Sequence, residues 1–408
     1  MQIKPILAAL SRHRTATVLI VLQVALTLAI VCNALFIAQQ RVAYLSRPTG
    51  IDEAHIAVIH NQWVGSPGLS EANASMLRDL AVLRGLPGVA DAYADYSYPA
   101  AGPSAQLLGI GLAHGQPRAS WAESYYADEH MLSTLGLKLV AGRNFRADEI
   151  VPLAATDGSL APPSIIVTRD LADTLFPQGG ALGRAVFIGD KPSTIIGVIA
   201  DLQVPAVGTR SFAHRSVLMP NRLAAASETY YLVRARPGQM DAVMHAAPMA
   251  LLAADRMRII EAGEGVQRFS DLRTAAYARD FGVATLMSLL CVVLLGATAG
   301  GIFGFTSFWV GQRRRQIGVR RAVGATQSDI LRYFQTENFL IVSGGIALGL
   351  LLAVVLNLIL MEHYELPRLP LVYLPIGALV LWALGQFAVL GPALRAAAVP
   401  PMVATRSV

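Results

Sequence analysis

The stretch FGVATLMSLLCVVLLGATAGGIFGFTSFWVG, residues 281–311, contains no charged side chain, and QRRRQIGVRRAVGATQSDILRYF, residues 312–334, follows it directly. About 20 apolar residues in a helix cross the hydrocarbon core of a bilayer, so the first stretch is long enough to span a membrane. The second stretch places five arginines in its first ten positions. A block this basic could be a solvated charge run, a nucleic-acid patch, a membrane stop signal or a docking surface for another protein.

Four uncharged stretches indicate a membrane protein. They cover Ala16–Ala38, Phe281–Gly311, Phe339–Met361 and Leu371–Leu394. The chain is only 15% charged, and its mean hydropathy is +0.49, whereas about a quarter of the residues in an ordinary soluble domain are charged. We therefore predict an α-helical membrane protein with four transmembrane helices, one before and three after a large α+β extracytoplasmic domain at residues 39–280.

The basic residues are concentrated beside these predicted spans. The net charge is +6, and the segments 1–14, 312–338 and 395–408 together carry more than this excess, which leaves the large domain slightly acidic. Nucleic-acid binding requires a basic face on a folded domain, so this distribution removes its main support. Because Lys and Arg next to a span remain in the cytoplasm, we predict cytoplasmic termini and a large domain on the opposite side.

The N-terminal segment, residues 1–15, places Ile3, Ile6, Leu7 and Leu10 on one helical face. This pattern predicts an interfacial helix on the inner leaflet, with a frayed end as the alternative. The apolar run 16–38 that follows is longer than the core of a signal peptide, and no clear A-x-A site comes after it. We expect a retained anchor rather than a cleaved leader.

Two strand–helix–strand patterns lie at the two ends of the large domain. The first covers AHIAVIH, SEANASMLRDLAVLRGL and GVADAYADYSY, and the second covers TYYLVRARPG, GQMDAVMHAAPMALLAAD and RMRIIEAGEG. Such units often pair as a split βαβ layer, which we predict at residues 39–119 and 206–280, with a mixed subdomain inserted at about 120–205. The sequence contains no H-E-x-x-H, G-x-S-x-G or P-loop motif. We expect no catalytic, metal or cofactor site in this chain.

Glycines recur at helical spacing in two of the spans. Gly296, Gly300 and Gly304 are four residues apart in the second span, and Gly345 and Gly349 repeat this spacing in the third. Small residues at this spacing let two helices approach closely in lipid, so we predict helix–helix interfaces there. The alternative is that glycine is simply common in membrane helices.

The basic block 312–334 contains more than a stop signal requires. Gly324 suits a helix C-terminal cap, and Thr326-x-x-Asp329 is a capping-box pattern that begins a new helix. We therefore predict a short helix near 312–323, a break, and a second helix that runs into the third span. Apolar residues between the arginines, Ile317, Val319, Ala322 and Val323, make the first helix amphipathic. These features indicate a rigid elbow that fits against a partner.

The stretch RRRQIGVRRAVGATQSDILRYFQTENFLIVSGG, residues 313–345, resembles the signature region of MacB/FtsX-type ABC transporter permeases. In that family a basic coupling helix with an I-G-x-R-x-A-x-G-A core precedes the third span. The tail GPALRAAAVPPMVATRSV is similar to the closing segment of the family. In the large domain YYADEHMLSTLGLKLVAGRNF, SIIVTRDLADTLFP, LGRAV and IIGVIAD are similar to the MacB-like periplasmic core. The resemblance covers nearly the whole chain.

The resemblance implies a protein of the bacterial inner membrane that forms a dimer with itself or with a sister permease. A separate cytoplasmic ABC ATPase would bind ATP and Mg, and in MacB-like systems a membrane-fusion adaptor and an outer-membrane channel join the periplasmic domain. The implied contacts with the ATPase are Arg313, Arg314, Arg315, Gln316, Ile317, Gly318, Arg320, Arg321, Ala322, Gly324 and Asp329. Gln316 departs from the family pattern, which often has Glu there.

We therefore expect a permease subunit of an ABC export complex that works by mechanotransmission on a small-molecule, peptide or lipid-linked cargo. The alternative is an FtsX-like regulator that transports nothing and activates a cell-wall hydrolase. A receptor with a sensory outer domain would need a cytoplasmic signalling module, and the sequence contains none.

Overall fold

The computed structural model describes residues 14–65, 68–103, 106–154, 161–205, 211–225, 228–364 and 367–398. The predicted interfacial helix at residues 1–15 lies almost wholly outside these ranges. The chain divides into two compact units, a helical unit at residues 1–46 and 279–408 and a large domain at residues 47–278. The names helical unit and large domain are used below in this sense.

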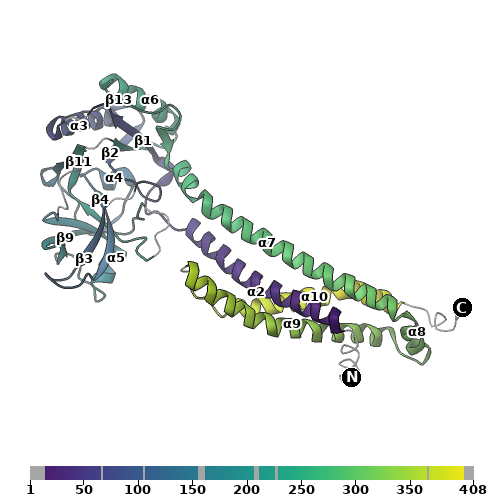
Figure 1. The fold of residues 1–408 in the computed structure, drawn as a ribbon. Coiled ribbons are helices and arrows are strands. Elements are labelled where there is room, and N and C mark those ends of the chain that lie inside the picture. The colour runs from purple at the N-terminus through teal and green to yellow at the C-terminus, as the bar shows by residue number, and fades with distance from the viewer. Residues whose placement is uncertain are drawn as a thin grey trace. The chain divides into compact units, whose positions relative to one another are not determined.

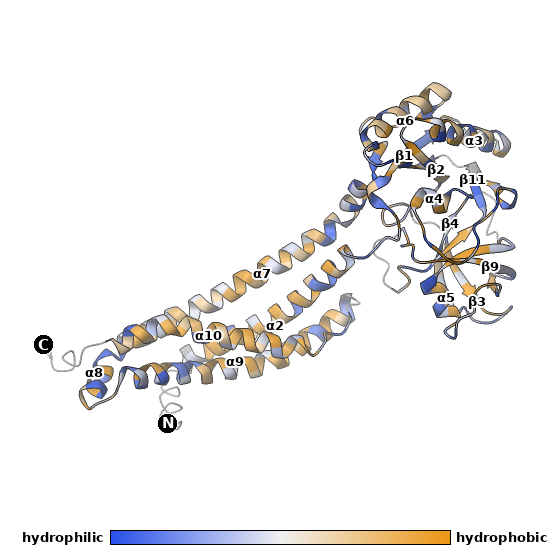
Figure 2. Cartoon of the chain, turned by 180° about the vertical axis from the view of Figure 1, so that it is seen from behind, coloured by the Kyte–Doolittle hydropathy of each residue, from blue (hydrophilic) through white to orange (hydrophobic). Residues whose placement is uncertain are grey.

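The helical unit consists of α2 (Arg14–Leu45), most of α7 (Phe269–Gln312), α8 (Arg314–Ala322), α9 (Gln327–Tyr364) and α10 (Tyr373–Ala397). Four of these, all except α8, are long and apolar enough to cross a membrane. Figure 2 shows their largely hydrophobic colouring. Each helix extends past its predicted uncharged span at one end or both, because a backbone helix can continue into water while only its apolar part must remain in lipid.

Close packing in the helical unit centres on α2, α9 and α10, which lie side by side (Figure 1). Their buried contacts include Val24 and Leu28 of α2, Val342 and Ile346 of α9 and Leu381 of α10. Helix α7 joins this bundle through polar contacts as well: the hydroxyls of Thr27 and Thr298 are 2.8 Å apart. Gln23 Nε2 also donates to the backbone oxygen of Ala297 at 3.1 Å.

The first lobe of the large domain is a five-stranded antiparallel sheet. Its order is β13-β1-β12-β2, and β14 also pairs with β1. The strands are β1 (Ile56–Trp63), β2 (Val89–Asp95), β12 (Glu228–Ala235), β13 (Arg258–Ile259) and β14 (Val266–Arg268). Because β12 lies between the strands β1 and β2 that flank α3 (Leu69–Gly85), the layer has the split βαβ arrangement. Met76, Leu80 and Val243 carry the apolar faces of α3 and of α6 (Met240–Ala254) onto this sheet.

The second lobe is a seven-stranded mixed sheet of order β5-β9-β7-β10-β4-β3-β8, with β8 also paired to β9. Its strands are β3 (Leu107–Gly111), β4 (Ser120–Tyr126), β5 (Leu139–Gly142), β7 (Ser164–Thr168), β8 (Ala185–Ile188), β9 (Lys191–Ile199) and β10 (Ser216–Met219). Helix α5 (Arg169–Leu175) packs its Leu171 and Leu175 into the core of this lobe, and α4 (Met131–Leu135) follows β4. Short 3-10 turns at Glu53–His55 and Ala147–Glu149, and a parallel pair of β6 (Val151–Ala154) with β11 (Asn221–Ala225), complete the domain.

The division between the two lobes differs from the sequence prediction at both boundaries. Strand β3 was expected in the first layer but pairs with β4 and β8 of the second sheet. Strand β10 was also expected with the first layer, but it lies between β4 and β7. The alternation of apolar residues predicts that a short strand exists. It does not predict which sheet the strand joins, because that depends on pairing between distant segments.

Candidate functional site

The basic block forms an elbow between α7 and α9. The N–H of Arg313 donates to the oxygen of Trp309 at 3.1 Å, and the N–H of Ile317 donates to the oxygen of Arg313 at 2.9 Å, so α8 follows α7 with only a slight break. Figure 2 shows α8 as a mainly hydrophilic segment between apolar helices. The elbow is defined here as residues 312–329.

The turn of the elbow has the predicted caps. Gly324 has φ +103°, a left-handed conformation that favours glycine, and its N–H donates to the oxygen of Arg321 at 3.2 Å. The backbone N–H of Asp329 donates to Thr326 Oγ1 at 3.2 Å, and Asp329 Oδ2 accepts from the N–H of Thr326 at 3.0 Å. This reciprocal pair is a capping box in which aspartate takes the place of the usual glutamate, and it begins α9. The structure confirms both predictions.

One face of α8 is fixed to the helical unit. Ile317 and Gly318 are buried, and Ile317 belongs to the same apolar cluster as Ile330 of α9 and Ala393 of α10. Arg321 Nη1 donates to the backbone oxygen of Ala397 at 3.0 Å. The helix is therefore packed against the ends of two neighbouring helices.

Arg313 is the arginine with the strongest contacts to α9. Its Nη1 lies 3.4 Å from a carboxylate oxygen of Glu337 and 3.3 Å from the hydroxyl of Tyr333. Its guanidinium also stacks 4.0 Å from the ring centroid of Trp309. Glu337 is only 3% exposed, so this ion pair is shielded from water and is screened less by salt than a surface pair.

The opposite face of α8 is open to solvent. Arg314, Arg315, Gln316, Arg320 and Ala322 are exposed. Val319 and Val323 are also exposed, by 47% and 84%. The four apolar residues of the predicted amphipathic helix are therefore divided, with Ile317 inside and the others outside. Val319 and Val323 are four positions apart, so they form a small apolar area among the exposed arginines.

The structure separates the five predicted interface glycines into two groups. A Cβ at Gly345 would lie 2.7 Å from Val24 Cβ, and one at Gly349 would lie 2.9 Å from the backbone oxygen of Ala25, so both glycines permit the close contact of α9 with α2. Cβ atoms at Gly296, Gly300 and Gly304 would meet no atom within 4 Å in the described part of the chain. This second group forms an open stripe on α7.

Three residues outside the elbow, which are not named in the prediction from the sequence, contact its Arg313: Trp309, Tyr333 and Glu337. The available signal was spacing: Trp309 precedes Arg313 by four residues, and Tyr333 precedes Glu337 by four. In the described residues, no group of three or more His, Cys, Asp or Glu side chains could hold a metal ion.

Two family models together match most of the chain. The MacB-like periplasmic core domain matches residues 17–248, and the FtsX-like permease C-terminal region matches residues 279–401. The second match begins at residue 279, directly after the large domain ends at Ala278.

Three curated relatives illustrate the similarity. The macrolide export ATP-binding/permease protein MacB of Chromobacterium violaceum is 26% identical over 53% of this chain and 32% of its own length. Its counterpart in Shewanella sp. strain ANA-3 is 26% identical over 88% of this chain and 52% of its own length. The uncharacterized ABC transporter permease YvrN of Bacillus subtilis is 22% identical over 70% of each chain. The chain thus spans between a third and about half of the MacB proteins.

Proposed function

The chain belongs to the MacB/FtsX-type ABC transporter permeases, and we propose that it is the transmembrane permease subunit of an ATP-driven export complex that works by mechanotransmission. The sequence has no P-loop, and the MacB relatives combine an ATP-binding part with the permease. In this proposal a separate cytoplasmic ABC ATPase binds ATP and Mg and supplies the energy.

The observation that carries the proposal is the two-sided character of α8. Its inner face is fixed by Ile317 and by the Arg321 contact to α10, and its outer face presents Val319 and Val323 among exposed arginines. A helix that is fixed on one side and bare on the other can transfer the movement of a protein that binds the bare side. A groove on an ATPase that accepts an apolar side chain and carries acidic residues at its rim would fit this face.

Helix α7 supplies the connection through the membrane. It is one helix from Phe269 in the large domain to Gln312 beside α8, with no proline in its 44 residues. At about 1.5 Å per residue it is roughly 66 Å long. A displacement at the elbow would therefore be transmitted along a continuous helix to the large domain.

The assembly and the cargo are further parts of the proposal. The open stripe Gly296, Gly300 and Gly304 supports pairing with a second copy or a sister permease. The names of the two MacB relatives refer to macrolide export. We propose a small molecule, a peptide or a lipid-linked compound as the cargo of this permease. An adaptor and an outer-membrane channel would join at the large domain.

The test compares two valines of matched exposure. The full chain is co-expressed with the ABC ATPase of its own genome that co-purifies with it, reconstituted in nanodiscs and assayed for ATP hydrolysis. Val319→Asp, at the exposed face of α8, should abolish the stimulation of the ATPase by the permease. Val64→Asp, at a site 48% exposed in the large domain, should leave it intact. Undiminished stimulation in Val319→Asp would show that α8 is not the coupling surface.

A further inference from the structure

We propose that Tyr277 of α7 is a positioning residue that makes the second lobe of the large domain follow this helix, through a buried contact with Gln203. The inference rests on the proposed mechanotransmission function and assigns it a specific path. Residues 269–278 of α7 belong to the large domain, so every contact used in the argument lies within that domain.

The first lobe needs no special contact to follow α7. Strand β14 pairs with β1 in the first sheet and ends at Arg268, one residue before α7 begins. Phe269 is fully buried, and its ring packs edge-on against Tyr98 at 6.5 Å between centroids. A movement of α7 therefore reaches the first sheet through one peptide bond.

The second lobe has no such direct link, because its strands lie in the chain segment between β2 and β12. A buried contact between this lobe and α7 is made by Gln203, whose Nε2 donates to the hydroxyl of Tyr277 at 2.7 Å. Tyr277 is 3% exposed and Gln203 is 1% exposed. The hydrogen bond is thus removed from water, where its loss costs most.

Gln203 is itself fixed in the second lobe. Its backbone oxygen accepts from the hydroxyl of Tyr125 at 2.7 Å, and Tyr125 lies fully buried on β4. The neighbouring backbone oxygen of Leu202 accepts from Ser216 Oγ on β10 at 2.9 Å. The two strands that hold this segment are adjacent in the second sheet. A displacement of Tyr277 therefore acts on the middle of that sheet.

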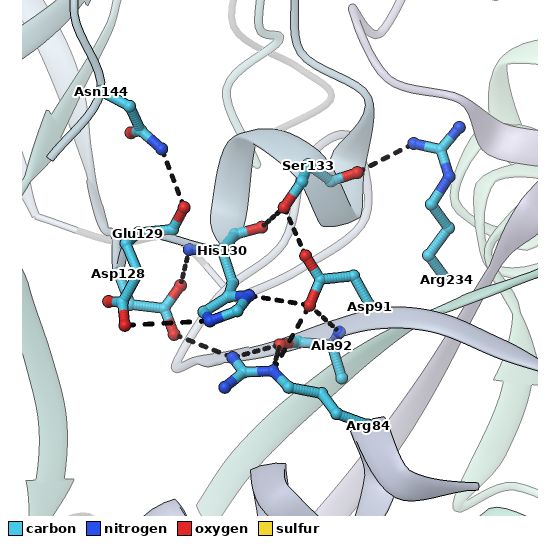
Figure 3. A network of polar contacts seen from close by, with 9 residues as sticks. All are labelled: Arg84, Asp91, Ala92, Asp128, Glu129, His130, Ser133, Asn144 and Arg234. Atoms are coloured by element: carbon cyan, nitrogen blue, oxygen red, sulfur yellow. Dashed lines mark hydrogen bonds and ion pairs between the residues drawn. The ribbon is translucent and has the colours of Figure 1, made fainter. Parts of the chain in front are cut away.

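The second lobe also contacts the first lobe through the polar network of Figure 3. Arg84 lies 3.4 Å from Asp128, which follows β4, and His130 Nδ1 lies 2.9 Å from Asp91 of β2. In this network Asp128 is buried, whereas Arg84 and His130 are partly exposed. We expect this network to set the orientation of the second lobe relative to the first. The contact of Tyr277 with Gln203 would then make the second lobe move with α7.

The experiment measures spin-label distances in the full-length chain in nanodiscs, without any ATPase. Cys32 and Cys291 are first replaced by serine. Spin labels are then attached to cysteines introduced at three exposed positions: Thr274 of α7, Lys191 of the second lobe and Ala253 of the first lobe. Tyr277→Ala should at least double the width of the Thr274–Lys191 distance distribution and leave the Thr274–Ala253 distribution unchanged. A purely structural role would broaden both.

Two milder variants guard against general unfolding. Tyr277→Phe keeps the ring and removes only the hydroxyl, and Gln203→Ala removes the donor from the second lobe. Each should broaden the Thr274–Lys191 distribution alone, and the double variant should broaden it no further than the larger single effect, because both remove one shared contact.

Ser133→Ala serves as the control at the lobe junction, where the Ser133 hydroxyl donates to Asp91. It should leave the Thr274–Lys191 distribution narrow. If Ser133→Ala broadened this distribution and the Tyr277 variants did not, the junction would hold the second lobe and the proposal would be wrong. Because no ATPase is present, such a result would leave the proposed function untouched, whereas a failure of the Val319→Asp test would leave this contact standing.

Discussion

The guanidinium of Arg313 lies 3.4 Å from the carboxylate of Glu337 and holds the start of α8 against α9. The side chains of both residues are largely shielded from water, with 16% and 4% exposure. A desolvated charge that loses its partner is strongly destabilised. This pair should therefore contribute to the stability of the packing between the elbow and α9.

Glu337→Gln should loosen the elbow. Glutamine keeps the size of the side chain but leaves the Arg313 charge without its partner. We expect trypsin to cleave within residues 313–321 of the nanodisc-embedded chain about tenfold faster, which corresponds to about 1.4 kcal/mol in the free energy of opening. Glu362→Gln, at the exposed far end of α9, is the control. Equal cleavage rates in both variants would contradict this role.

Gly349→Leu should destabilise the helical unit, since a Cβ at Gly349 would lie only 2.9 Å from the backbone oxygen of Ala25. Leucine would force α9 away from α2, and the thermal midpoint of the detergent-solubilised chain should fall. Gly300 has open space around it, so Gly300→Leu should leave this midpoint unchanged. Native mass spectrometry should instead show that Gly300→Leu reduces dimer formation. If this variant formed dimers as the wild-type chain does, the open stripe on α7 would not be the dimer interface.

Asp79→Asn should lower the free energy of unfolding of the first lobe more than a substitution that breaks an exposed ion pair. Arg258 makes two hydrogen bonds to Asp79, of 2.8 and 2.9 Å, and the side chains are 0% and 2% exposed. Removing one partner of a buried pair costs about 3–5 kcal/mol. Glu149→Gln, which breaks the exposed pair with Arg143, is the matched control and should show little loss. Denaturant unfolding followed by tryptophan fluorescence, with Trp63 beside Arg258, would measure both.

The pH dependence of stability should include a contribution from Asp95. Burial raises the pKa of this carboxyl well above its usual value, although backbone N–H groups such as that of Tyr96 oppose the shift. An acid whose pKa is higher when folded contributes stability that is complete below its unfolded pKa of about 3.9 and is lost as pH rises through the folded pKa.

Asp95→Asn should therefore stabilise the large domain more at pH 8 than at pH 4.5, because the neutral amide is never ionised. The thermal midpoints of the wild-type chain and the variant, compared at the two pH values, give the measurement. A stabilisation that is the same at both pH values would mean that Asp95 does not titrate with a raised pKa.

Local sequence features predicted the elbow correctly. Gly324 and the Thr326–Asp329 pair act within one turn of helix, and their conformations depend only on neighbouring residues. The uncharged runs predicted the membrane helices for the same reason, since the cost of charge in lipid acts on each residue separately. The contact of Arg313 with Glu337 could not be predicted in this way, because it depends on how α7 and α9 pack across the elbow. The contact of Arg313 with Trp309 has a local signal, the spacing of four residues.

The sequence by itself determined the membrane class, the one-plus-three arrangement of helices around a large domain, and the caps of the elbow. All of these follow from composition or from spacing within a few residues. Only the tertiary structure decided that Gly349 faces α2 while Gly300 stays open, that β3 and β10 belong to the second sheet, and that Tyr277 meets Gln203. These features depend on pairs of segments that are far apart in the chain, and their pairing is set by the packing of whole lobes and helices rather than by local preference.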